Sequence, residues 1–84
     1  MADVTMAEAK RDFRHGLITG ADVVRPGMSA GVWSVVLRYT VGGPLFGSVL
    51  LVDARTRKPR EFRTLDAAFS ALEQIGLRPE ALKV

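Results

Sequence analysis

Apolar and polar side chains alternate most clearly over residues 31–40. Because successive side chains of a strand point to opposite faces, a period of two predicts a β-strand here. Its first face carries Trp33, Val35, Leu37 and Tyr39, and its second face carries Val32, Ser34, Val36, Arg38 and Thr40.

A hairpin is predicted to follow this strand. Gly42-Gly43 supplies the backbone freedom of a tight turn, and residues 45–53 return as the antiparallel partner. A loop of two or of four residues gives the same register, which pairs Thr40 with Leu45. Both faces of the hairpin are then largely apolar, so we expect the N-terminal helix or a second copy of the protein to cover the second face. That face is predicted to place Val36 opposite Val49 and to carry the interface residues Val32, Val36, Val49 and Leu51.

Two helices are predicted to flank the hairpin. The first begins at the capping box of Thr5 and Glu8 and runs to about His15, with Gly16 at its end. The second begins after Thr64 and ends at Gly76. Apolar side chains at helical spacing are Met6, Ala9, Phe13 and Leu17 in the first helix, and Leu65, Ala68, Phe69, Leu72 and Ile75 in the second.

Two shorter strands have weaker patterns, at residues 22–25 and 60–63. The second of these would place Phe62 in the core. The length of 84 residues fits one domain. We therefore expect a single α+β domain over residues 1–84, with an N-terminal helix, a three- or four-stranded antiparallel β-meander and a C-terminal helix packed on the sheet.

The amino-acid composition excludes several kinds of catalytic and metal site. The chain has no cysteine, which excludes disulfides, thiolate zinc sites and a cysteine nucleophile, and it has one histidine, His15. The glycine-rich run at residues 42–48 lacks the lysine of a phosphate loop and joins two predicted strands. We expect no catalytic residue, metal, cofactor or small-molecule substrate, and hence no enzyme.

The expected location is the cytoplasm. The first residues contain no apolar run typical of a secretory signal, and the longest clearly apolar stretch, residues 49–52, is far shorter than the ~20 residues of a membrane helix. We expect no membrane association.

Positive charge is concentrated in residues 55–63. This segment has five basic residues and one acidic residue, whereas the rest of the chain has seven basic and eight acidic residues. Arginine matches phosphate oxygens with two parallel hydrogen bonds, so this loop is a candidate site for nucleic acid. As the partner we expect DNA in preference to RNA. The alternative is a solvated loop whose charges protect a strand edge from aggregation. The candidate residues are Arg55, Arg57, Lys58, Arg60 and Arg63.

A basic patch on the first helix and the aromatic residues near the sheet are expected to have structural roles and not to bind a ligand. A second, weaker basic patch on the first helix is interpreted as a solvated helix face. The four aromatic side chains near the sheet are interpreted as core, although aromatic residues on sheets also stack on bases in single-strand binders. The patch consists of Lys10, Arg11, Arg14 and His15, and the aromatic residues are Trp33, Tyr39, Phe46 and Phe62.

The basic run continues into Phe62-Arg63-Thr64-Leu65-Asp66-Ala67-Ala68 and a helix that ends at Ile75-Gly76. With the preceding strand, this pattern resembles small plasmid-encoded accessory proteins of the partition-associated kind over residues 33–76. The resemblance implies a bacterial cytoplasmic protein tied to plasmid maintenance, and it carries no catalytic residues.

The order of helix, three strands and helix is also similar to a double-stranded RNA-binding domain. That family has a basic cluster at the start of its second helix, where this chain has Leu65-Asp66-Ala67-Ala68. Two functions therefore remain open. One is nucleic-acid binding through the basic loop, and the other is a protein-interaction module, either a homodimer or an adaptor for a partition protein or other partner.

Overall fold

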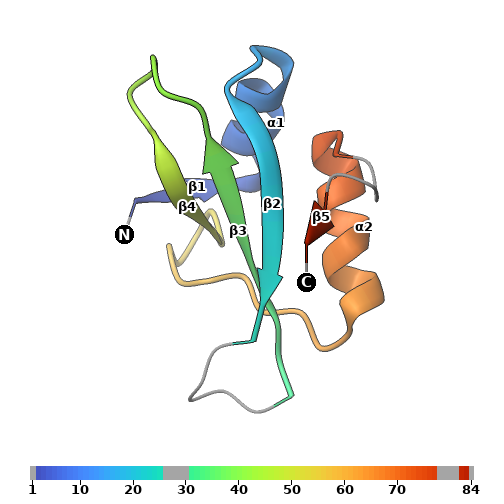
Figure 1. The fold of residues 1–84 in the computed structure, drawn as a ribbon. Helices are drawn as coiled ribbons and strands as arrows, with labels where there is room; N and C mark the ends of the chain where they lie inside the picture. The colour runs from blue at the N-terminus through green and yellow to red at the C-terminus, as the bar shows by residue number, and fades with distance from the viewer. Residues whose placement is uncertain (1, 26–30, 78–81, 84) are drawn as a thin grey trace.

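The computed structural model describes residues 2–25, 31–77 and 82–83. Across these residues the chain forms two helices and one sheet of five strands, in the strand order β1-β4-β3-β2-β5 (Figure 1). The α+β class is confirmed. Along the chain, the elements are β1 (Asp3–Thr5), α1 (Met6–Arg14), β2 (Ile18–Val24), β3 (Ser34–Tyr39), β4 (Gly47–Val52), α2 (Leu65–Ile75) and β5 (Leu82–Lys83).

The sheet is mixed, which corrects the expected purely antiparallel meander. Strands β2, β3 and β4 are antiparallel neighbours, but β1 pairs parallel with β4 and β5 pairs parallel with β2. The two outer strands have three and two residues. Strands this short contain too few positions to show a period of two, so the pattern of apolar and polar residues could not predict them. Both pair with strands that are distant in sequence.

The register of the central hairpin differs by one residue from the expected one. Val36 pairs with Leu50, and Leu37 pairs with Val49. The connection between Tyr39 and Gly47 has an odd number of residues, whereas the expected loops were even. Because side chains alternate along a strand, a shift of one residue moves every partner to the other face.

This shift separates the four predicted interface residues. Val49 and Leu51 lie in the core with Val35 and Leu37, whereas Val36 is buried outside that cluster. The prediction that Val32, Val36, Val49 and Leu51 share one face is therefore wrong.

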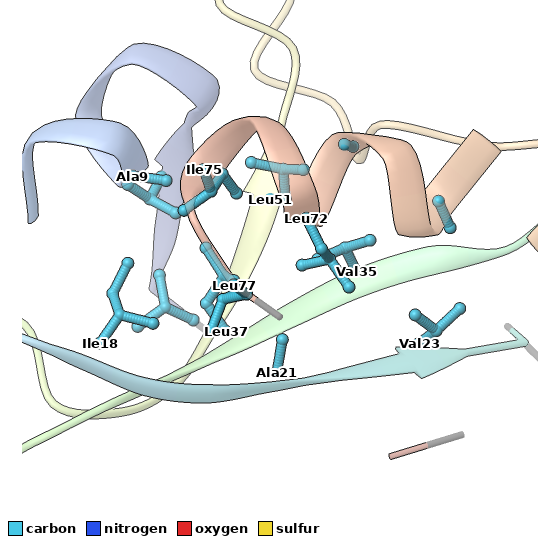
Figure 2. Close-up of a cluster of buried hydrophobic side chains, with 14 of the residues drawn as sticks. Ala9, Ile18, Ala21, Val23, Val35, Leu37, Leu51, Leu72, Ile75 and Leu77 are labelled. Carbon is cyan, nitrogen blue, oxygen red and sulfur yellow. The ribbon is translucent and has the colours of Figure 1, made fainter. Parts of the chain in front are cut away.

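Both helices pack on the same face of the sheet. Ala9 of α1 and Leu72 of α2 belong to one buried cluster with the strand residues that alternate on this face (Figure 2). The N-terminal helix thus helps to cover the first face and not the second. The labelled members of the cluster are Ala9, Ile18, Ala21, Val23, Val35, Leu37, Leu51, Leu72, Ile75 and Leu77.

Local signals place the helix ends as expected. The Thr5 N–H donates to Glu8 Oε1 at 2.9 Å and the Glu8 N–H donates to Thr5 Oγ1 at 3.3 Å, so the predicted capping box is present. The Ala67 N–H donates to Thr64 Oγ1 at 3.0 Å and caps α2. At the other end of α2, Gly76 has a φ of 125°, a conformation that other residues rarely adopt.

The two weaker strand predictions have different outcomes. The strand expected at residues 22–25 is the end of the longer β2, which begins at Ile18. The strand expected at residues 60–63 is absent, because this segment forms only an isolated bridge between Phe62 and Trp33. The Arg60 N–H also donates to the Leu51 carbonyl at 3.0 Å, so the segment contacts β4 as well as the residue before β3. Phe62 is buried, as predicted.

Candidate nucleic-acid interface

The basic segment begins with a tight loop after β4, held by its own backbone. The Asp53 N–H donates to the Lys58 carbonyl at 2.8 Å, and the Arg57 N–H donates to the Asp53 carbonyl at 2.9 Å. Asp53 Oδ1 accepts from the N–H groups of Arg55 at 2.8 Å and Thr56 at 3.0 Å. The hydrogen bonds from Thr56 and Arg55 lower the pKa of Asp53 below its usual value. The loop therefore has a defined shape although its side chains are exposed.

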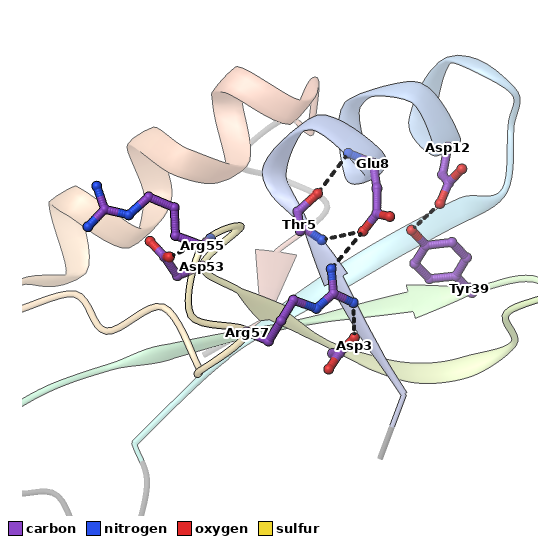
Figure 3. A network of polar contacts seen from close by, with 8 residues as sticks. All are labelled: Asp3, Thr5, Glu8, Asp12, Tyr39, Asp53, Arg55 and Arg57. Carbon is purple, nitrogen blue, oxygen red and sulfur yellow. Dashed lines mark hydrogen bonds and ion pairs between the residues drawn. The ribbon is translucent and has the colours of Figure 1, made fainter.

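Arg57 closes this loop in an unusual conformation. Its φ of 59° lies in the left-handed region, and among the described residues no other non-glycine residue has a positive φ. Glycine and asparagine adopt this region more readily than arginine does. The Arg57 side chain turns toward β1 and α1, where its Nη2 lies 2.5 Å from Asp3 Oδ1 and its Nη1 lies 3.8 Å from Glu8 Oε1 (Figure 3).

The other predicted phosphate contacts are placed differently. Arg55 and Lys58 lie exposed on the same loop, and Figure 3 shows the Arg55 side chain pointing away from Arg57. Arg60 is half-buried, with its guanidinium 5.4 Å from the ring centre of Phe62, and Arg63 is exposed just before α2. The structure thus brings three of the five residues together on one loop and places two on the segment that follows.

Two acidic residues next to the loop were missed by the sequence interpretation. Asp3 and Glu8 are more than forty positions away from Arg57 in the chain, and they reach it because β1 pairs with β4, with Asp3 beside Leu50. Residue patterning gives no signal for this neighbourhood. Because these two carboxylates lie beside Arg57, the local positive charge there is smaller than the five basic residues of the segment 55–63 indicate.

The second basic patch is exposed, whereas the aromatic residues differ in their burial. Lys10, Arg11, Arg14 and His15 are all exposed on or next to α1. Tyr39 is buried, and the half-buried Trp33 packs against the core with the Arg25 guanidinium 4.6 Å from its ring centre. Phe46, by contrast, is 68% exposed in the β3–β4 loop, so its assignment to the core is wrong.

A buried polar pair was also unexpected. Asp12 of α1 is buried, and its Oδ2 accepts a hydrogen bond of 2.6 Å from the Tyr39 hydroxyl. Its Oδ1 accepts from Arg11 Nε at 3.1 Å. Burial, and then the hydrogen bond to Asp12, raise the pKa of Tyr39 above its usual value. This pair joins α1 to β3 and has no evident chemical task.

Residues 2–25, 31–77 and 82–83 contain no group of three or more histidine, cysteine, aspartate or glutamate side chains arranged to hold a metal ion. In the same ranges, neither helix has the length and apolar character needed to cross a membrane.

Comparison with known proteins indicates neither a family nor a function for this chain. No protein-family model, no curated protein and no solved structure matches this chain. Function must therefore be inferred from the arrangement of its own side chains.

Proposed function

We propose that this protein binds the phosphate groups of nucleic acid, DNA in preference to RNA, through the loop that follows β4. The observation that carries the proposal is the combination of a hydrogen-bonded loop backbone with exposed basic side chains at Arg55 and Lys58. A loop that is already ordered loses little conformational entropy when its side chains bind a ligand. Such a loop is suited to binding rather than to chemistry, and we propose no catalytic step.

The five basic residues would act in different ways. The Arg55 guanidinium can donate two parallel hydrogen bonds to one phosphate, whereas the Lys58 ammonium acts as a compact charge. Arg63 is exposed and extends the positive surface toward α2, and Arg60 is half-buried against Phe62. Each phosphate contact releases counterions from the nucleic acid, so binding is expected to weaken steeply with salt.

The resemblance of residues 33–76 to partition-associated accessory proteins supports a role in plasmid maintenance. A small non-enzymatic protein that binds DNA without a catalytic site would suit such a role. The resemblance concerns the pattern of residues, whereas the phosphate-binding proposal rests on the loop itself.

Fluorescence anisotropy with duplex DNA, single-stranded DNA and RNA over a salt series tests this proposal. Replacing Arg55 and Lys58 together by Ala should reduce affinity and flatten the log-log salt slope on duplex DNA by about 1.8, at about 0.9 for each lost phosphate contact. The matched control replaces Lys10 and Arg14, which are exposed on α1, and removes the same charge elsewhere. No binding at low salt, or an equal loss in the control, would reject the loop as the binding site.

A second candidate function is self-association through the sheet face opposite the helices. On this face Val24 is 39% exposed and Leu50 is half-buried, whereas Val36 and Val52 are already buried in the single chain. A second copy of the chain could cover this face. Sedimentation equilibrium should then give a dimer that Val24→Asp dissociates and that Val41→Asp, in the exposed β3–β4 loop, leaves intact. A wild-type monomer at all concentrations would exclude this candidate.

A further inference from the structure

We infer that the Arg57 guanidinium is an anion subsite that the free protein fills with its own carboxylates, and that a nucleic-acid phosphate binds there by displacing Asp3. This inference rests on the proposed function, because it assigns a role to the residues around the same loop. It predicts that Asp3 opposes nucleic-acid binding.

The first observation is the geometry around the guanidinium. Both terminal nitrogens of Arg57 face carboxylate oxygens, with Nη2 at 2.5 Å from Asp3 and Nη1 at 3.8 Å from Glu8 (Figure 3). A phosphate presents its oxygens to a guanidinium in a similar paired manner. The internal carboxylates therefore occupy the positions that a bound phosphate would take.

The second observation is the backbone of Arg57. A left-handed φ of 59° is unfavourable for an arginine, and a glycine or asparagine would adopt it more readily. The conformation directs the side chain toward β1 while Arg55 points elsewhere. An arginine at this strained position is explained if its guanidinium has a binding task as well as the two ion pairs.

The third observation distinguishes the two carboxylates. Glu8 Oε1 also accepts the Thr5 N–H at 2.9 Å, and this bond lowers the pKa of Glu8 more than Arg57 and Arg11 do. Glu8 is thus held by the helix cap. Within the described ranges, the Asp3 carboxylate has no hydrogen-bond partner other than Arg57. Asp3 is therefore the carboxylate that a phosphate can replace.

The fourth observation is the solvent exposure of Arg57 and Asp3, because an exposed ion pair can be replaced at little cost in free energy. The side chain of Arg57 is 50% exposed and that of Asp3 is 37% exposed. Ion pairs this open to solvent contribute little net stability, because water screens them and two side chains must be ordered. A phosphate from solvent can reach Arg57, and losing the Asp3 contact costs little.

The decisive experiment compares Asp3→Asn with Glu73→Gln, which removes one negative charge from an exposed position on α2. On duplex DNA, Asp3→Asn should raise affinity about fivefold, because the phosphate no longer competes with a carboxylate, and it should leave the log-log salt slope unchanged, because the same phosphates are contacted in both complexes. Glu73→Gln should raise affinity less than twofold and leave the slope unchanged. Adding Arg57→Asn, which tolerates the left-handed backbone, to Asp3→Asn should cancel the gain.

The outcomes separate the inference from the proposed function. If the wild type binds no nucleic acid at low salt, the proposed function fails. If the wild type binds but Asp3→Asn behaves like Glu73→Gln, only the inference is overturned. Circular dichroism checks that Asp3→Asn is folded. A measurement that needs no variant follows the Arg57 Nε–H NMR resonance of the wild type as a DNA oligonucleotide is added, and an unchanged resonance at saturation would also overturn the inference.

Discussion

At the scale of single residues, the contact between Asp12 and Tyr39 shows how a charged group is accommodated in this small core. Asp12 lies in α1 between the apolar positions Ala9 and Phe13, where the helical pattern alone favours an apolar residue. Its carboxylate is satisfied by the Tyr39 hydroxyl and by Arg11. A buried carboxylate without such partners would cost several kcal/mol, so the pair must be kept together.

Tyr39 should make the protein sensitive to alkaline pH. Its pKa is raised in the folded state, so the folded protein retains a proton that the unfolded chain releases above the usual tyrosine pKa of 10.0. This contribution to stability is complete below about pH 10 and is lost as pH rises further. Because the chain has one tyrosine, tyrosinate absorbance should appear only together with unfolding.

The variant Tyr39→Phe provides the comparison. It should reduce the free energy of unfolding by about 1–3 kcal/mol at neutral pH, because Asp12 loses a buried donor, and it should remove this source of alkaline sensitivity. Tyrosinate absorbance that rises near pH 10 in a wild-type protein still folded by circular dichroism would contradict the expectation.

At the scale of elements, the helices are determined mainly by signals within the chain segment itself. Thr5 and Glu8 form the capping box across three residues, and Thr64 caps α2 across the same interval. These bonds need no distant partner, which is why both helix starts could be predicted. The end of α2 depends on Gly76 as expected, but the structure adds a neighbour, because Phe13 of α1 packs against it.

Gly76 should therefore be less replaceable than Gly16. A Cβ at Gly76 would lie 2.6 Å from Phe13 Cε2, and the φ of 125° is unfavourable for any side chain. A Cβ at Gly16, whose φ is 75°, would meet no atom within 4 Å. We expect Gly16→Ala to cost about 1 kcal/mol and Gly76→Ala roughly 2–4 kcal/mol, since it adds a steric clash to the backbone strain.

Urea denaturation of the two alanine variants measures this difference. If both variants lose the same free energy of unfolding, the contact between Gly76 and Phe13 does not constrain the fold. A partial recovery in Gly76→Ala with Phe13→Leu, compared with Gly76→Ala alone, would support the steric explanation.

At the scale of the whole molecule, the mixed sheet has a central strand and two short outer strands. Strand β3 is paired on both sides, by β2 and β4, whereas β1 pairs with β4 alone. Strand β1 also carries Val4, which is fully buried, and Asp3, which contacts Arg57. A three-residue strand therefore supports both the core and the candidate binding loop.

Native-state hydrogen exchange should reveal this difference between strands. The hydrogen-bonded amides of β3 should exchange only when the whole domain unfolds, because both neighbouring strands cover them. The Leu50 amide, which donates to the Ala2 carbonyl at 3.0 Å, should exchange faster through local release of β1. NMR-detected exchange with equal protection at both places would show that β1 separates only with global unfolding.

The amino-acid sequence by itself determined what local interactions can specify. It predicts both helices, their caps, the central hairpin and the concentration of basic residues after β4, because these depend on neighbours a few positions apart. The exposure of Phe46 and the burial of Asp12 were not accessible in this way. Each depends on which distant element covers the residue.

Only the tertiary structure decided the hairpin register, the two parallel outer strands and the surroundings of Arg57. In the structure Leu50 pairs with Val36 on one side and with Asp3 on the other, and this arrangement buries Val49, Leu51 and Val4 in the cluster that both helices share. Apolar residues on both faces of the hairpin allowed either register, so local patterning could not choose between them. The same long-range pairing brings Asp3 to Arg57 and changes an apparently free basic loop into one whose central arginine is already engaged.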